Sequence, residues 1–134
     1  MTEEQHFKCH AIIHAASVTA CGVGAGLAQL PGSDNAVIVP IQIGMVISIG
    51  AVFGVKLNES AAASTLATST ATLVGRGLSQ ALVGWIPGIG NIVNAVTAAG
   101  VTEAIGWAVA GSFDYVKKGN VIKERKENEK HRKC

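Results

Sequence analysis

The middle of this chain is almost free of charged residues. The formally charged residues between Cys9 and Phe113 are Asp34, Lys56, Glu59, Arg76 and Glu103. A soluble domain normally has about a quarter of its residues charged. This stretch therefore has to hide most of its surface from water, either in contacts between subunits or in lipid. A lone water-soluble monomer is the least expected state.

Turn-forming residues divide the charge-poor stretch into helical segments. Groups of Pro, Gly and Asn interrupt it at residues 30–35, 54–58 and 86–91, and we expect a turn at each. The predicted helices cover about Thr2–Leu30, Asn35–Phe53, Glu59–Trp85 and Gly90–Lys117, with a fifth, charged helix after Gly119. At 134 residues the chain has the length of one domain, which we predict to be all-α.

Four residues next to the turns suit helix ends. Asp34 and Asn58 can cap the starts of the second and third helices, because their side-chain oxygens accept hydrogen bonds from free backbone N–H groups. Gly54 and Gly119 can end the second and fourth helices in a left-handed conformation. These residues predict where the helices begin and stop.

An internal repeat predicts how the helices are grouped. Shifting the sequence by 56 residues aligns Pro31-Gly32 with Pro87-Gly88, and Asn35 with Asn91. We interpret this as a duplicated helical hairpin, of about residues 1–56 and 57–118, forming a four-helix core. The second and fourth helices are apolar nearly all round and should lie at its centre. Residues 119–134 form a basic tail outside this core.

The tail carries both signs of charge at short spacing. From Val116 to Cys134, eight Lys or Arg residues stand against three Glu residues. Glu127 precedes His131 and Glu129 precedes Lys133 by four positions, so ion pairs along a solvated helix are expected. This mixed pattern favours a solvated helix over a nucleic-acid-binding arm, and no nucleic-acid partner is predicted.

The cysteines indicate a reducing compartment. Cys9 and Cys21 lie on one predicted helix, about 18 Å apart by helical rise, and cannot form a disulfide with each other. Cys134 leaves the total odd. A cytoplasmic location fits best.

Three histidines near the start of the chain are the candidate metal ligands. His6, His10 and His14 are spaced by four residues, so their imidazoles share one face of a helix and could coordinate a metal or a haem. No carboxylate accompanies them beyond Glu3. The alternative is an amphipathic helix whose histidines face water or a neighbouring subunit, and this is the favoured interpretation.

No catalytic arrangement can be assembled from the remaining polar residues. The two charges predicted inside helices are Arg76 and Glu103, which lie at comparable depth from the Pro87-Gly88 turn. Because an unpaired buried charge is costly, we expect a structural ion pair between them, or contacts to another subunit. The glycines of residues 22–26 lie inside a helical pattern with no strand before them, so they favour close helix packing over nucleotide binding. No catalytic residue and no cofactor are predicted.

Several motifs resemble one bacterial family. They are Pro40-Ile41-Gln42, Phe53-Gly54, residues 85–90 (WIPGIG) and residues 102–107 (TEAIGW). Over about residues 10–115 the chain resembles the bacterial domain of unknown function, family 697, which is usually attached to GTPase domains. The resemblance implies an accessory helical domain, often predicted to touch membranes, with no active site to carry over. Since the GTPase half is missing here, it implies partners in trans or self-association.

These observations lead to three functional hypotheses. The leading one is a non-enzymatic, cytoplasmic, helical homo-oligomer, acting as an accessory to a membrane surface or a GTPase. The alternative is an integral membrane protein that crosses four times, with the third, Ser- and Thr-rich helix lining a pore and with Lys8, Lys56 and the tail on the cytoplasmic side. The third is a metal- or haem-binding protein that uses the histidines.

Overall fold

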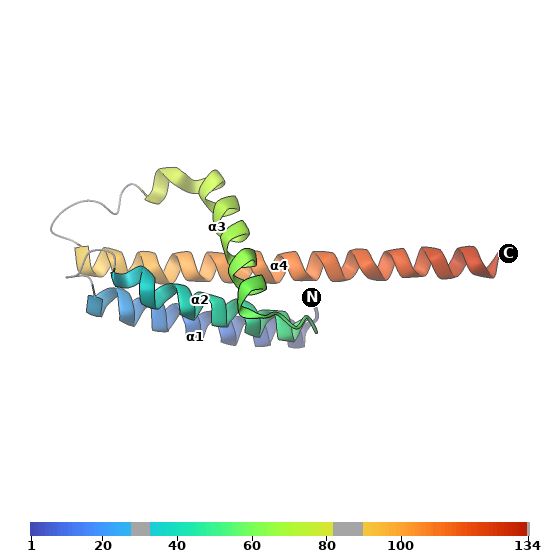
Figure 1. Ribbon diagram of the computed structural model, residues 1–134, viewed down its shortest axis with the longest axis horizontal. Helices are drawn as coiled ribbons and strands as arrows, with labels where there is room; N and C mark the ends of the chain where they lie inside the picture. Colours follow the sequence, from blue (N-terminus) through green and yellow to red (C-terminus); the bar gives the residue numbers. More distant parts are fainter. Residues whose placement is uncertain (28–32, 82–89, 134) are drawn as a thin grey trace.

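The fold is all-α, as predicted. A computed structural model describes residues 1–27, 33–81 and 90–133, with side chains for 1–24, 37–72 and 98–133. The helices are α1 (Glu3–Leu27), α2 (Ser33–Val52), α3 (Glu59–Ala81) and α4 (Gly90–Arg132), and no strand occurs in these ranges (Figure 1). The predicted turns at Pro31-Gly32 and Pro87-Gly88 lie outside the described residues.

Local side-chain and backbone chemistry explains the helix ends that can be seen. At the start of α1, Thr2 N–H donates to Gln5 Oε1 (3.0 Å) and Gln5 N–H donates to Thr2 Oγ1 (3.2 Å), a reciprocal capping box. At the start of α3, Asn58 Oδ1 accepts a hydrogen bond from Ala61 N–H (2.7 Å), which confirms the predicted cap. The other predicted cap, Asp34, has its side chain outside the described part.

The end of α2 is a Schellman motif. Gly54 has a φ of 78°, the left-handed conformation that glycine adopts most readily. The N–H of Val55 donates to the carbonyl of Gly50 (2.9 Å), and the N–H of Gly54 donates to the carbonyl of Ala51 (3.1 Å). The predicted left-handed stop at Gly54 is confirmed.

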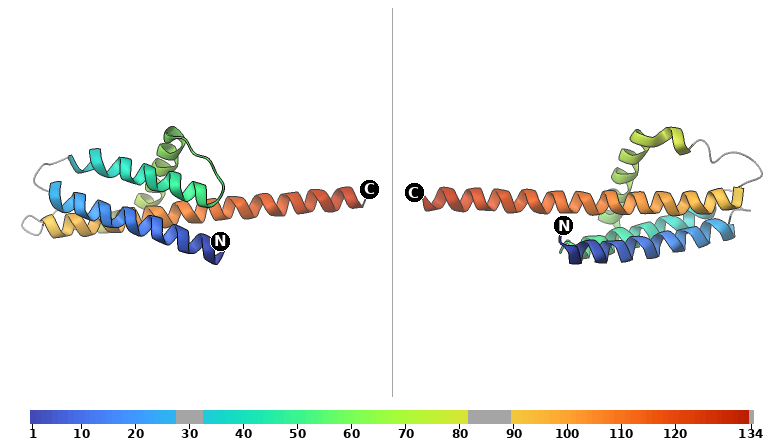
Figure 2. Two further views of the ribbon diagram at one scale, coloured as in Figure 1. Left: turned by 90° about the horizontal axis from the view of Figure 1, so that it is seen from below. Right: turned by 180° about the vertical axis from the view of Figure 1, so that it is seen from behind.

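The core lies where α1, α2 and α4 run side by side, with the first half of α3 added from one side (Figures 1 and 2). Both α2 and α4 contact all three other helices, whereas α1 and α3 do not touch each other in the described ranges. These contacts agree with the predicted central position of the two helices, although α2 also keeps one side open to solvent. The buried cluster consists of Cys9, Ile13, Ala16, Met45, Val46, Ile49, Phe53, Ala62, Leu66, Ile105, Val109 and Ala110.

The two predicted hairpins are not arranged alike. The α1 and α2 helices lie alongside each other, and α1 also packs along α4 (Figure 2). By contrast, α3 rises steeply across α4, and in the described residues it contacts α4 far less extensively than α1 does (Figure 1). The sequence repeat therefore predicted the order of helices and did not predict how the second pair packs.

The prediction of a separate fifth helix is wrong. Residues after Gly119 are helical, but they continue α4, which runs without a break to Arg132. Gly119 does not adopt the left-handed conformation that would end the helix. A glycine inside a helix costs only about 1 kcal/mol relative to alanine, and the Lys-, Glu- and Arg-rich residues from Lys123 onward favour helix. The expected i,i+4 pair is present between Glu129 and Lys133 (2.9 Å).

Candidate interaction surfaces

The three N-terminal histidines are exposed and two of them pack against an aromatic ring of α4. The ring centroid of His6 lies 5.0 Å from that of Trp107, and the centroid of His10 lies 6.3 Å from it. His10 and His14 stack on each other with centroids 5.8 Å apart and an angle of 9° between the rings. Trp107 is half-buried, so this patch joins α1 to α4 at the surface.

This arrangement does not gather metal ligands. Cys9, which precedes His10, is buried in the core on another side of α1, and burial raises the pKa of its thiol. Across the side chains that the structure describes, no group of three or more His, Cys, Asp and Glu residues converges as a metal site. The three-histidine site stays a prediction. Both Cys9 and Cys21 are free thiols, in agreement with the sequence interpretation.

Of the predicted ion pair between Arg76 and Glu103, the structure describes only the side chain of Glu103. Glu103 lies on α4 with its side chain exposed to solvent, so it does not carry the cost of a buried charge. Arg76 belongs to α3, and its side chain lies outside the described residues. Pairing between the two stays a prediction.

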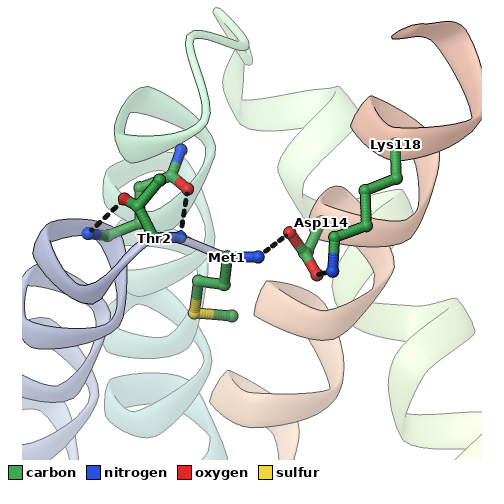
Figure 3. Close-up of polar contacts among 5 residues, drawn as sticks. Met1, Thr2, Asp114 and Lys118 are labelled. Carbon is green, nitrogen blue, oxygen red and sulfur yellow. Dashed lines mark hydrogen bonds and ion pairs between the residues drawn. The ribbon is translucent and has the colours of Figure 1, made fainter. Parts of the chain in front are cut away.

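An ion-pair cluster that sequence analysis missed ties the start of α1 to α4. The α-amino group of Met1 donates to Asp114 Oδ1, and the ammonium group of Lys118 lies 2.8 Å from Asp114 Oδ2 (Figure 3). Two hydrogen bonds lower the pKa of Asp114 below its usual value: the one from Lys118 has the larger effect, and the one from the Met1 amine adds to it. The same contact with Asp114 raises the pKa of Lys118. The i,i+4 spacing of Asp114 and Lys118 is a usable sequence signal, but nothing in the sequence indicates the contact with Met1.

One buried polar contact connects the two central helices. Gln42 Nε2 on α2 donates to Thr102 Oγ1 on α4 at 3.1 Å, and both side chains are buried. A buried amide needs such a partner, because an unsatisfied one is costly. This hydrogen bond therefore favours the orientation of α2 about its own axis in which Gln42 faces Thr102 of α4.

The solvent-facing side of α2 carries no charge. Its exposed residues among the described side chains are Val37, Pro40, Gly44, Ser48 and Ala51, whereas Val39, also exposed, lies on the opposite side of the helix. The exposed side of α1 after Lys8 likewise carries no Asp, Glu, Lys or Arg, and beyond the exposed histidines it presents mainly small or apolar residues, including Val18 at 59% exposed. Within the described side chains from Cys9 to Phe113, the formal charges are Lys56, Glu59 and Glu103 alone. The low charge of the sequence is therefore a property of the surface as well as of the core.

Beyond the core, α4 continues as a fully exposed charged helix, which we call the α4 extension (Tyr115–Lys133). Every residue in it is exposed, and in Figures 1 and 2 it projects away from the other helices. The charged surface of the protein is thus concentrated in an element that meets the core at its start, where Lys118 pairs with Asp114.

Comparison with known proteins adds no relative. No family model, no curated protein and no solved structure matches this chain. The resemblance to family 697 stays a prediction. Within the described residues, none of the helices has an apolar run of the length needed to cross a bilayer.

Proposed function

We propose that this chain is a non-enzymatic helical module that assembles with copies of itself. The observation that carries the proposal is the uncharged solvent-facing side of α2, from Val37 to Ala51. Monomeric soluble proteins rarely leave contiguous apolar patches larger than a few hundred Å² open to water, and patches of that size are characteristic of protein–protein contacts. A second copy of the chain is the simplest occupant, because most soluble oligomers are symmetric assemblies of one chain.

The residues on this face suit close packing between helices. Gly44, Ser48 and Ala51 are small and follow one another at spacings of four and three, so another helix can approach the backbone of α2 closely. Val37 and Pro40 extend the same side toward the start of the helix. Covering these groups removes apolar surface from water, with a gain of about 25 cal/mol per Å².

A matched pair of serines tests this contact. Ser48 on α2 and Ser112 on α4 are both exposed, and both hydroxyls donate to the backbone carbonyl four residues earlier, at 2.8 and 2.9 Å. We expect Ser48→Lys to weaken self-association at least tenfold, because the ammonium group would be buried without a partner. Ser112→Lys introduces the same charge outside the proposed contact and should leave association unchanged.

The assay is the molecular mass of the full chain in detergent-free buffer, measured by light scattering over a range of concentrations. An unmodified chain that stays at 13.7 kDa at every concentration refutes self-assembly. Equal effects of the two lysine substitutions would place the contact elsewhere than on α2. A GTPase partner in trans is supported by the family resemblance alone.

A further inference from the structure

The α4 extension concentrates positive charge. It contains eight Lys or Arg residues and three Glu residues, which gives a net charge of +5 with His131 neutral. The whole chain has a net charge of +2, so the rest of the molecule is slightly acidic, at −3. Because the extension projects from the core and is exposed on all sides, this charge is free to meet a partner (Figure 1).

Four of the six lysines of the extension gather on one side, which we call the lysine face (Lys123, Lys126, Lys130 and Lys133). Their spacings of three, four and three residues keep them together on a helix of about 3.6 residues per turn. Three of them, Lys126, Lys130 and Lys133, line one shallow open hollow together with Glu129. The carboxylate of Glu129 is paired with the ammonium group of Lys133 at 2.9 Å, so it does not reverse the sign of the face.

Two exposed apolar side chains continue this face toward the core. Ile122 lies one helical turn before Lys126, and Tyr115 lies two turns before Ile122. Tyr115 is 80% exposed and Ile122 is 54% exposed. Val116 and Val121 are also exposed, at 57% and 44%, but they lie on other sides of the helix, whereas Tyr115 and Ile122 line up with the cations.

Of the three acidic residues of the extension, Glu124 lies opposite the lysine face, whereas Glu127 and the Lys133-paired Glu129 lie at its two edges. At about 100° per residue, Glu124 and Lys117 lie on the side of the helix opposite Lys126, and Glu127 lies at the edge. A flat anionic surface would meet only the lysine face and leave Glu124 in water. The groove of a nucleic-acid duplex would enclose the helix and bring its phosphates close to Glu124 and Glu127, which disfavours that partner.

We propose that the lysine face docks on the surface of an anionic phospholipid bilayer, with Tyr115 and Ile122 entering the headgroup region. Lysines near such a surface each contribute about fivefold in affinity at low salt, and exposed aromatic and aliphatic side chains add apolar contact. The helix lies on the bilayer and does not cross it. This inference goes beyond the proposed self-assembly and does not require it.

Two charge reversals on the extension provide the test. Lys126→Glu and Lys117→Glu change the net charge equally, but the first lies on the lysine face and the second lies opposite it. The full-length chain and both variants are sedimented with phosphatidylcholine vesicles that either contain or lack phosphatidylserine. We expect the unmodified chain to bind only the vesicles with phosphatidylserine, more weakly at higher salt. Lys126→Glu should reduce that binding about 30-fold, and Lys117→Glu less than threefold.

Three outcomes would overturn the proposal. The first is equal binding of the unmodified chain to both kinds of vesicle, or to neither. The second is an equal loss in the two variants, which would indicate attraction to net charge without a docking face. The third is tighter binding to random-sequence duplex DNA than to the anionic vesicles at the same salt concentration. Circular dichroism of both variants checks that the extension is still helical. The difference in binding of the unmodified chain to the two kinds of vesicle tests the proposal independently of either variant.

Discussion

Helices α1 and α4 pack tightly at a glycine, and filling it should separate them. A Cβ atom added at Gly106 would lie 2.7 Å from Cγ1, 3.0 Å from Cγ2 and 3.1 Å from Cδ1 of Ile13. Ile13 is 1% exposed, and both of its γ carbons are bonded directly to Cβ. They cannot move aside without rotating a β-branched side chain inside a packed core, so the helix backbones must shift instead.

The magnitude follows from two opposing effects of Gly106→Ala. Overpacking a core by one methyl group costs about 1–3 kcal/mol. Alanine is favoured over glycine inside a helix by about 1 kcal/mol. Gly111→Ala, on the same helix, is the matched control, because a Cβ there meets nothing within 4 Å. The helix-propensity gain is the same in both variants, so Gly106→Ala should be less stable than Gly111→Ala by about 1–3 kcal/mol.

Urea unfolding at one fixed protein concentration, followed by circular dichroism, measures the free energy of unfolding of each variant. If Gly106→Ala is as stable as Gly111→Ala, α1 and α4 do not approach each other this closely at Gly106 in solution. Ile13→Ala supplies a second check, since it removes all three atoms that the new methyl group would meet. In that background Gly106→Ala should become neutral or stabilising.

Three further predictions concern other contacts. Gly54→Ala should cost about 1–2 kcal/mol in unfolding free energy, because the φ of 78° is unfavourable for alanine; an unchanged value would contradict the Schellman motif. Thr102→Val should cost about 1–3 kcal/mol by leaving the buried Gln42 amide unsatisfied, and adding Gln42→Leu should recover part of that loss. The pKa of Asp114 is lowered below its ordinary value of 3.8, so its ionised form stabilises the fold above that pH, and the gain is lost as pH falls through the lowered pKa. Asp114→Asn should therefore flatten the acid limb of a plot of unfolding free energy against pH, and an unaltered limb would show that the contacts with Lys118 and Met1 are not formed in solution.

The sequence alone determined the helix ends where local chemistry acts within a few residues. Asn58 caps α3 and Gly54 stops α2 as predicted, because each effect depends on one side chain and the next turn of backbone. The all-round apolar character of α2 and α4 predicted a central position for both, which their contacts with all three other helices support, but it did not predict that one side of α2 stays open to water. The same reasoning failed at Gly119, since glycine only disfavours helix weakly and no second signal stops α4 there.

Contacts between residues far apart in the sequence were decided only by tertiary structure. Trp107 against His6, Asp114 with the Met1 amine, and Gly106 against Ile13 all depend on how α1 is rotated and shifted along α4. Small and aliphatic residues recur on several sides of both helices, so the sequence pattern allows many such alignments with similar burial. The well-packed core selects one of them through the shapes of its side chains, and shape complementarity across helices is a property that no single segment carries.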